Sequence, residues 1–530
     1  MLRQITTTIT SQTRRFTSTT VAKAAAAGRD WSAAPPLIIR NGTVVNHDGM
    51  FKADVLTEEG KIIKVGHITA EDVPSNAREI DATNRYVMPG GIDTHTHLEM
   101  PFMGTTTIDD YHYGTTAAVA GGTTLLMDFV IPSKDGGLVN AYKEWEARAV
   151  PKINCDIAFH LAVTYYSDEM LEEMKTITND YGVTSYKFFM AYNGVLRMYD
   201  DELLNVFQRC KDIGALAQVH AENGDMVDAG QQAMVDAGIM GPEAHGMSRP
   251  AATEAEATHR AIAIADQSNT PLYVVHVMSK EAAHEVARAK KAGINVYGEP
   301  IAAALGTDGR QMFDPDWRHA AGHVMSPPLR DDPTTKDDLM RALKNNELDC
   351  VGTDNATFNA NQKALGKDDF RTIPNGCNGI EDRMSVVWHK GVKGMDMTPS
   401  DFVRITSTKA AMLFNMYPNK GRIAEGCDAD IVVWDGDNQR TVSKDTHHHA
   451  VDFNIFEGMS FYGIADKTIS GGRVVWEDNE LKTENGWGRI VKREPFGYAY
   501  RDHATTEKER DPRKRKVERK PYDGPVIFLS

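Results

Sequence analysis

A long alternation of apolar runs and amphipathic segments between residues 89 and 415 constrains the fold most strongly. Runs such as TTLLMDFVI, CDIAFHLAVT and PLYVVHVM have the length of buried strands, and SDEMLEEMKTITND and SKEAAHEVARAKKA have helical periodicity. Repeated strand–helix units build a parallel sheet covered by helices. About eight units are present, the number in a TIM-type (β/α)8 barrel. An open doubly wound sheet is the alternative, but no GxGxxG motif follows the first strand to support its dinucleotide-binding form.

The segments on either side of this region are rich in β-sheet signals. Residues 36–88 contain short β-branched runs separated by turn dipeptides such as Asn41-Gly42 and Asp48-Gly49, which is the pattern of successive hairpins. Residues 416–480 return to this pattern in GRIAEGCDADIVVWD and KTISGGRVVWEDNELK. We therefore predict an α/β protein in which a barrel over residues 89–415 carries a small β-sandwich domain formed from N-terminal and C-terminal segments.

The two ends of the chain differ in composition from the rest. Residues 1–30 are rich in Ser, Thr and Ala and carry five basic residues with no acidic residue before Asp30, as in a mitochondrial transit peptide. The alternative is a disordered tail, so we expect the protein in mitochondria or in the cytoplasm. Residues 481–530 form a C-terminal extension, and its part from residue 504 onward is dense in charge and expected to be solvated.

Charge and cysteine content narrow the classes of partner and of metal site. The net charge of −15 argues against nucleic acid or an anionic membrane surface as a main partner, and no apolar run approaches the length of a membrane span. Five scattered cysteines without a CxxC pair indicate neither a disulfide scaffold nor a thiolate zinc site. Any metal must therefore be held by histidine and carboxylate ligands.

Ionisable residues stand at or near the ends of several apolar runs, where the chemistry of a barrel of this type gathers. His95 and His97 lie two residues apart in GGIDTHTH, so that in a strand both imidazoles point to one side. Four further ionisable residues stand at or near the ends of later apolar runs: Lys187, His220, His276 and Asp354. Because burying unpaired ionisable groups is costly, their recurrence predicts a shared site.

Each of these residues also has a plainer interpretation. A single strand histidine is more often a hydrogen-bonded core residue than a metal ligand, and an isolated lysine more often keeps its amine at the surface. His160 is interpreted as a core residue or a support behind the site, and the run His447–His449 as a loop outside the barrel. Asp93 is expected to accept a hydrogen bond from a ligand imidazole, or to have a structural role only.

Several longer motifs resemble the cyclic amidohydrolases of the amidohydrolase superfamily, over residues 36 to 500. They are GGIDTHTHLEMPFMGT, SYKFFMAYNG, VHAEN, VHVMS, HVMSPPLR, GTDNATFN and NGCNGIEDRMSVVW. Within the superfamily they are most similar to the branch that opens dihydropyrimidine and hydantoin rings. The resemblance implies a hydrolase whose substrate is a small cyclic amide.

The resemblance implies two zinc ions per subunit at the mouth of the barrel. The more buried ion would be held by His95, His97 and Asp354. The more exposed ion would be held by His220 and His276, with Lys187 bridging both ions as N6-carboxylysine. A lysine ammonium has no lone pair for a cation, whereas a carbamate offers two anionic oxygens.

The resemblance also implies roles in catalysis. Asp354 would take a proton from the attacking water and pass it to the leaving ring nitrogen, and Tyr192 would support the oxyanion. Ser326 and Asn378 would hold the ureide edge of the substrate, largely through backbone groups. The implied reaction opens 5,6-dihydropyrimidines such as dihydrouracil and dihydrothymine to N-carbamoyl-β-amino acids, as in reductive pyrimidine catabolism.

Two alternatives stay open within this resemblance. Allantoinase and other cyclic imide hydrolases share the ligand set, although NGCNGIEDR and GTDNATFN favour the dihydropyrimidine branch. The collapsin-response mediator proteins share the fold and act as scaffolds that have lost metal ligands, whereas all six ligand positions are intact in this chain. Members of the family are commonly homotetramers, and the resemblance implies the same assembly here.

Overall fold

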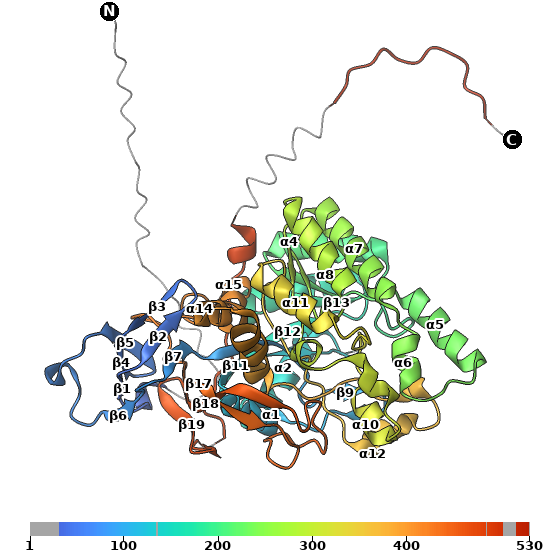
Figure 1. Cartoon of the computed structure of the whole chain (residues 1–530). Coiled ribbons are helices and arrows are strands. Elements are labelled where there is room, and N and C mark those ends of the chain that lie inside the picture. The colour runs from blue at the N-terminus through green and yellow to red at the C-terminus, as the bar shows by residue number, and fades with distance from the viewer. Residues whose placement is uncertain (1–30, 134–135, 484, 502–515, 529–530) are drawn as a thin grey trace, which may run out of the picture.

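Seven parallel strands form the central sheet, in the order β16-β15-β14-β13-β12-β11-β8. The computed structural model describes residues 31–133, 136–483, 485–501 and 516–528 (Figure 1). The strands are β8 (Gly91–Thr96), β11 (Thr123–Val130), β12 (Asp156–Ala162), β13 (Ser185–Phe189), β14 (Leu216–His220), β15 (Leu272–Val274) and β16 (Val296–Gly298). Two parallel bridges, Thr96 to Asn355 and Ile301 to Gly352, join the next segment to both sides and close the ring. The predicted barrel is confirmed, with an eighth strand reduced to residues 352–355.

Helices between the strands cover the outside of the barrel. The longer ones are α1 (Tyr111–Ala120), α2 (Leu138–Ala149), α3 (Asp168–Thr176), α4 (Asp200–Ile213), α5 (Gly224–Asp236), α7 (Ala251–Ser268), α8 (Lys280–Lys291) and α11 (Thr335–Lys344). The shorter ones are α6 (Glu243–Met247), α9 (Ala302–Gly306), α10 (Trp317–Gly322), α12 (Ala360–Lys363), α13 (Arg383–Val387), α14 (Pro399–Val403) and α15 (Lys409–Leu413). Ser167 and Ser279 cap α3 and α8 by accepting hydrogen bonds from the backbone N–H groups of Met170 and Ala282.

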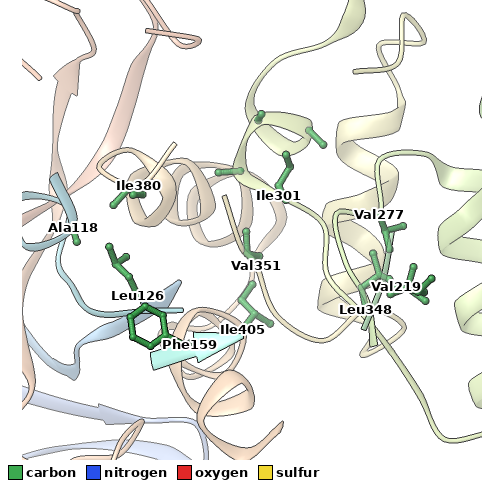
Figure 2. Packing of buried hydrophobic residues seen from close by; sticks show 14 of the residues in the cluster. Ala118, Leu126, Phe159, Val219, Val277, Ile301, Leu348, Val351, Ile380 and Ile405 are labelled. Atoms are coloured by element: carbon green, nitrogen blue, oxygen red, sulfur yellow. The ribbon is translucent and has the colours of Figure 1, made fainter. Parts of the chain in front are cut away.

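The apolar strands are buried on both faces, which explains why their sequences are continuous apolar runs. Every residue of β11 and β12 is buried, because helices cover one face and the barrel interior fills the other. Figure 2 shows Leu126 of β11 near Phe159 of β12 in the main hydrophobic cluster, with Val219 and Val277 in another part of it. This packing fixes the strands whose ends carry the candidate site residues.

A second body of sheet lies beside the barrel and is built from both ends of the chain (Figure 1). Its seven-stranded sheet has the order β20-β19-β18-β17-β7-β2-β3. These strands are β2 (Thr43–Asn46), β3 (Gly49–Lys52), β7 (Tyr86–Pro89), β17 (Ile431–Thr441), β18 (Ser460–Ser470), β19 (Arg473–Glu477) and β20 (Glu480–Leu481). A four-stranded sheet packs with them and contains β1 (Leu37–Arg40), β4 (Asp54–Glu58), β5 (Lys61–Gly66) and β6 (Arg78–Asp81).

The N-terminal and C-terminal segments share one hydrophobic core. Strand β7 pairs with β17 in antiparallel register, with Val87 opposite Val433. Both valines belong to a buried cluster that also contains Leu37 and Ile39 of β1. The prediction of a small sandwich-like domain formed from the two flanking segments is therefore confirmed.

An ion-pair junction ties this domain and the C-terminal segment to the base of the barrel. Lys420 Nζ lies 2.5 Å from Asp156 Oδ2 and 3.1 Å from Asp428 Oδ2, and it also pairs with Asp430. Arg489 Nη2 lies 3.1 Å from Asp428 Oδ2, and its guanidinium stands over a tryptophan ring. Lys61 also pairs with Asp428, so three cationic side chains occupy the three buried carboxylates and the cluster is a structural junction.

Two predictions about the chain ends fall wholly or partly on residues outside the described ranges. The transit-peptide prediction for residues 1–30 lies outside them, as do residues 502–515 of the C-terminal extension. Residues 516–528 are extended and largely exposed. Within the described ranges, no helix has the length and apolar character needed to cross a bilayer.

Candidate metal centre and active site

A cavity opens at the C-terminal ends of the barrel strands, where the sequence predicted the site. Its wall is formed by His95, His97, Met100, Phe102, Ile131, Lys187, Phe189, Tyr192, Leu196, His220, His276, Ser326, Asp354, Ala356 and Asn375. All six predicted ligand positions are in this wall, together with Tyr192 and Ser326. Residues far apart in sequence are brought together because parallel strands present their carboxyl ends on one side of the barrel.

His95, His97 and Asp354 form the first group of candidate ligands. Asp354 Oδ1 lies 3.1 Å from Nε2 of His95 and 3.1 Å from Nε2 of His97. One donor atom from each residue lies within 4.8 Å of the other two. Asp354 has a φ of +54°, a strained conformation for a residue with a side chain, and such strain is concentrated at functional sites.

His220 and His276 form the second group. Nδ1 of His220 lies 2.8 Å from Nε2 of His276, and Nε2 of His220 donates to Glu222 at 2.9 Å. Burial would raise the pKa of Glu222, but the Arg249 charge and the His220 hydrogen bond outweigh it and bring that pKa to about 2. Glu222 is therefore an anion that fixes the tautomer of His220 and leaves Nδ1 as a lone-pair donor to the cavity.

Lys187, on β13, is buried in the wall between these two groups. Its side chain is 2% exposed, and its amine lies 4.7 Å from the centre of the Phe129 ring. Burial lowers the pKa of Lys187 to about 8, against the opposing pull of the carboxylates of Asp354 and Glu299. The Lys187 charge in turn lowers the pKa of His95, His220 and His276, beyond the larger effect of their burial, so it lies close to both groups.

The carboxylate that supports His95 is Glu299, and the prediction that Asp93 accepts from a ligand imidazole is wrong. Glu299 follows β16, and its Oε1 accepts from Nδ1 of His95 at 2.9 Å while Oε2 accepts from the Tyr273 hydroxyl at 2.6 Å. Asp93 instead accepts from the backbone N–H and the hydroxyl of Thr353, at 3.1 and 2.7 Å. Asp93 therefore has the structural role, holding the segment that leads into Asp354.

Tyr192 presents its hydroxyl to the cavity from a tight loop. Its φ is +62°, and its carbonyl oxygen accepts from the backbone N–H groups of Val195 and Leu196, both at 3.0 Å. The hydroxyl is hydrogen-bonded to Ser326, and burial raises the pKa of Tyr192 to about 12. The phenol is therefore protonated at neutral pH and available as a hydrogen-bond donor.

The side chains of Ser326 and Asn375 form a polar edge of the cavity, and the side chain of Asn378 points elsewhere. Asn375 Nδ2 donates to Ser326 Oγ at 3.1 Å, and both residues line the cavity. Asn378 does not belong to the cavity wall, because its Oδ1 accepts from the backbone N–H of Ile455 at 2.9 Å. The prediction that Asn378 holds the substrate, largely through backbone groups, is not tested by this side-chain contact and stays a prediction; Asn375, three residues earlier in the same motif, is an additional residue of the cavity wall.

The remaining histidines lie where they were predicted. His160 is buried in the barrel, with Nδ1 2.6 Å from Ser185 Oγ, and it is not part of the cavity wall. The run His447–His449 lies in a loop after β17. A feature that the sequence did not reveal is that His449 is buried there and donates to Asp109 Oδ2 at 2.7 Å.

The donor set of the cavity fits a divalent cation. Because Nδ1 of His95 donates to Glu299, its buried Nε2 carries a lone pair and has no hydrogen-bond partner among the described residues. His276 Nδ1 is likewise buried without a partner in the part of the chain that the structure describes. Unpaired buried imidazole nitrogens beside a carboxylate oxygen are the donors that zinc prefers.

Comparison with known proteins agrees with this geometry. Residues 86–475 match the amidohydrolase family, whose superfamily is typically metal-dependent. The dihydropyrimidinase of Dictyostelium discoideum is 54% identical over 92% of this chain and 96% of its own length. Dihydropyrimidinase-related protein 5 of Homo sapiens is 43% identical over 94% of this chain and 88% of its own. The crystal structure of dihydropyrimidinase from Brevibacillus agri superposes with a TM-score of 0.85 at 44% identity, covering 87% of this chain and 99% of that one. The chain therefore belongs to the amidohydrolase family, in its dihydropyrimidinase branch.

Proposed function

We propose that the protein hydrolyses 5,6-dihydropyrimidine rings, dihydrouracil and dihydrothymine, to N-carbamoyl-β-amino acids in pyrimidine catabolism. The observation that carries this proposal is the convergence of six candidate ligands, Tyr192 and the Ser326–Asn375 edge on one cavity. The similarity to dihydropyrimidinases over most of the chain supports a cyclic amide as substrate.

The residues of the cavity would hold two zinc ions. His95, His97 and Asp354 would bind one ion, and His220 and His276 the other. Lys187 would bridge them as N6-carboxylysine, since its lowered pKa makes part of its amine uncharged and able to react with carbon dioxide. When bound, the paired ions supply a Lewis acid for the ring carbonyl and lower the pKa of water towards neutrality.

The side chains of the protein position the ring and move the protons. Water adds to the amide carbonyl carbon, the bond from that carbon to the ring nitrogen breaks, and the nitrogen leaves with a proton. Asp354 is placed to accept the water proton and return it to this nitrogen. The Tyr192 hydroxyl donates to the oxygen on which negative charge develops. Ser326 and Asn375 hold the ureide edge, and the apolar side chains of Phe102 and Leu196 limit the entry of bulk water.

A substrate panel with a metal assay tests the proposal. We expect the full chain, supplied with zinc and bicarbonate, to contain about two zinc ions per subunit and to hydrolyse dihydrouracil faster than hydantoin, allantoin or dihydroorotate. Preferential turnover of allantoin would favour the allantoinase alternative. A folded protein that binds no stoichiometric metal and opens none of these rings would contradict the proposal. It would favour the alternative of a non-enzymatic scaffold.

Glu299 provides a test of the support behind the metal site. Replacing Glu299 with glutamine is expected to weaken zinc binding by about 10- to 100-fold, because the neutral amide no longer orients and polarises the His95 imidazole. Titration with a zinc-binding chelator measures this change. Glu347→Gln, at an exposed position, is the matched control. Equal zinc affinity in Glu299→Gln and in the control would show that Glu299 does not support the ligand.

The oligomeric state is proposed from the similarity to dihydropyrimidinases, and the cellular location from the composition of the N-terminal segment. We propose a homotetramer, to be checked by light scattering of the purified protein. We also propose that residues 1–30 direct the chain to mitochondria, because they carry five basic residues and no acidic residue before Asp30. Import of the full chain into isolated mitochondria, compared with a chain beginning at residue 31, tests this proposal.

A further inference from the structure

Lys363 is a buried lysine outside the described catalytic machinery. It ends the short helix α12, and its side chain is 3% exposed. Its Nζ donates to two backbone carbonyl oxygens, Val324 O at 2.9 Å and Gly376 O at 2.7 Å. Among the described residues, no carboxylate lies within ion-pair distance of this amine. Burial lowers the pKa of Lys363 to about 7, so that much of the amine is uncharged near neutrality, with two N–H groups for its two acceptors.

The two carbonyl oxygens belong to the loops that carry the polar edge of the cavity. Val324 precedes Ser326 by two residues, and Gly376 follows Asn375 directly. Gly376 N also donates to Val324 O at 2.9 Å, and Asn375 Nδ2 donates to Ser326 Oγ at 3.1 Å. The Lys363 amine therefore lies at the contact between the two loops and is not part of the cavity wall.

The second of these loops is also held against the segment that carries Asp354. The backbone N–H of Ala356 donates to Cys377 O at 3.0 Å. Gly376 has a φ of +146°, and a Cβ there would lie 2.2 Å from Ala356 O, so only glycine allows this approach. The loop that carries Asn375 is therefore held both by residues 355–356 and by the Lys363 amine.

We propose that Lys363 is a positioning residue that fixes the Ser326–Asn375 edge for recognition of the ureide side of the substrate. The inference rests on the proposed function and deepens it, since it assigns ring binding to a residue that touches neither substrate nor metal. Without the amine, Gly376 O would lose this donor and Val324 O would keep only the N–H of Gly376, which would weaken the contact between the two loops. The affinity for the ring depends on the spacing of these loops, whereas Asp354 and Tyr192 belong to other segments of the chain, so the effect should fall mainly on KM.

Kinetics of substituted enzymes test this assignment. For Lys363→Met, which keeps the length of the side chain and removes its donors, we expect KM for dihydrouracil to rise about tenfold. The value of kcat should stay within about twofold, and the zinc content should be unchanged. Lys363→Gln should restore most of the wild-type KM, because its amide supplies two N–H groups without a charge. Leu339→Ala, which opens a buried position of α11, is the control for lost stability: it should lower Tm and leave KM unchanged.

The outcomes separate this inference from the function on which it rests. A wild-type KM in Lys363→Met, or a fall in kcat with loss of zinc, would overturn the positioning role. Should the methionine variant fail to fold, Lys363→Ala carries the same expectation and the same contradiction. A wild-type protein without turnover would contradict the proposed function instead. Calorimetric binding of N-carbamoyl-β-alanine to the zinc-loaded wild type and variants would then decide the inference, with weaker binding supporting it and equal binding overturning it.

Discussion

Replacing Lys187 with alanine is expected to remove bound zinc and dihydrouracil turnover together. The two histidine groups face a common space beside Lys187, and without a bridging anion the cations would be held by too few ligands and too little negative charge. Turnover should therefore fall to the uncatalysed background, while the fold is retained because the change removes a buried, desolvated amine. Zinc content by atomic emission and ring opening by the loss of ultraviolet absorbance measure the two effects.

Chemical rescue separates a bridging role for Lys187 from simple damage. Acetate or propionate added with zinc should restore part of the metal content and activity, because a short carboxylate supplies the two oxygens that the carbamate provided. Lys390→Ala, at a partly buried lysine outside the cavity wall, is the matched control and should need no rescue. Stoichiometric zinc with full turnover in Lys187→Ala would contradict the bridge.

The architecture of the barrel could be predicted from sequence because its strands are buried on both faces. Each of β11 and β12 reads as an unbroken apolar run, and the intervening helices read as amphipathic segments. The eighth strand could not be predicted in its observed form, because residues 352–355 join their neighbours through single-residue bridges only. The division of the β-rich segments into a seven-stranded and a four-stranded sheet could not be predicted either, since it depends on pairing between residues hundreds of positions apart.

The errors at the site come from contacts that sequence spacing does not encode. Asp93 shares the strand face of His95 and His97, so alternation alone made it the natural partner of an imidazole. The pairing of Asp93 with Thr353 across the barrel gives it another role. A search for ionisable residues near the ends of apolar runs could have identified Glu299, because it stands near the end of INVYGEP as His220 stands at the end of ALAQVH.

Asn375, whose side chain lines the cavity, was not identified from the sequence. Both asparagines lie in the motif NGCNG, and the sequence does not show which one faces the cavity. Gly376, with its φ of +146°, turns the chain so that Asn375 meets Ser326 while Asn378 meets Ile455. Positive φ values of this kind can be suspected at glycine but not assigned without the surrounding contacts.

Replacing Tyr192 with phenylalanine is expected to lower kcat by about 10²- to 10³-fold while zinc is retained. The substitution removes one hydroxyl and keeps the ring. Both residues carry a Cβ, so the strain at a φ of +62° is the same in the two proteins. Because the pKa of Tyr192 is raised to about 12, the wild-type hydroxyl is a donor throughout the neutral range, and its loss should not shift the pH profile there. Steady-state kinetics across pH 6–9, with zinc content measured in parallel, check both expectations.

The pattern of kinetic change distinguishes Tyr192 from Lys363 more sharply than the size of either effect. A hydrogen bond that strengthens as charge develops on the ring oxygen acts on kcat, whereas a contact that sets the spacing of the binding edge acts on KM. Tyr199→Phe, at an exposed tyrosine near the same loop, is the control and should behave as wild type. If Tyr192→Phe raised KM and left kcat unchanged, its hydroxyl would be a binding contact and the oxyanion assignment would fail. If it instead lowered kcat alone while Lys363→Met raised KM alone, the polar edge would recognise the ring and the Tyr192 hydroxyl, although it contacts Ser326, would act on the chemistry.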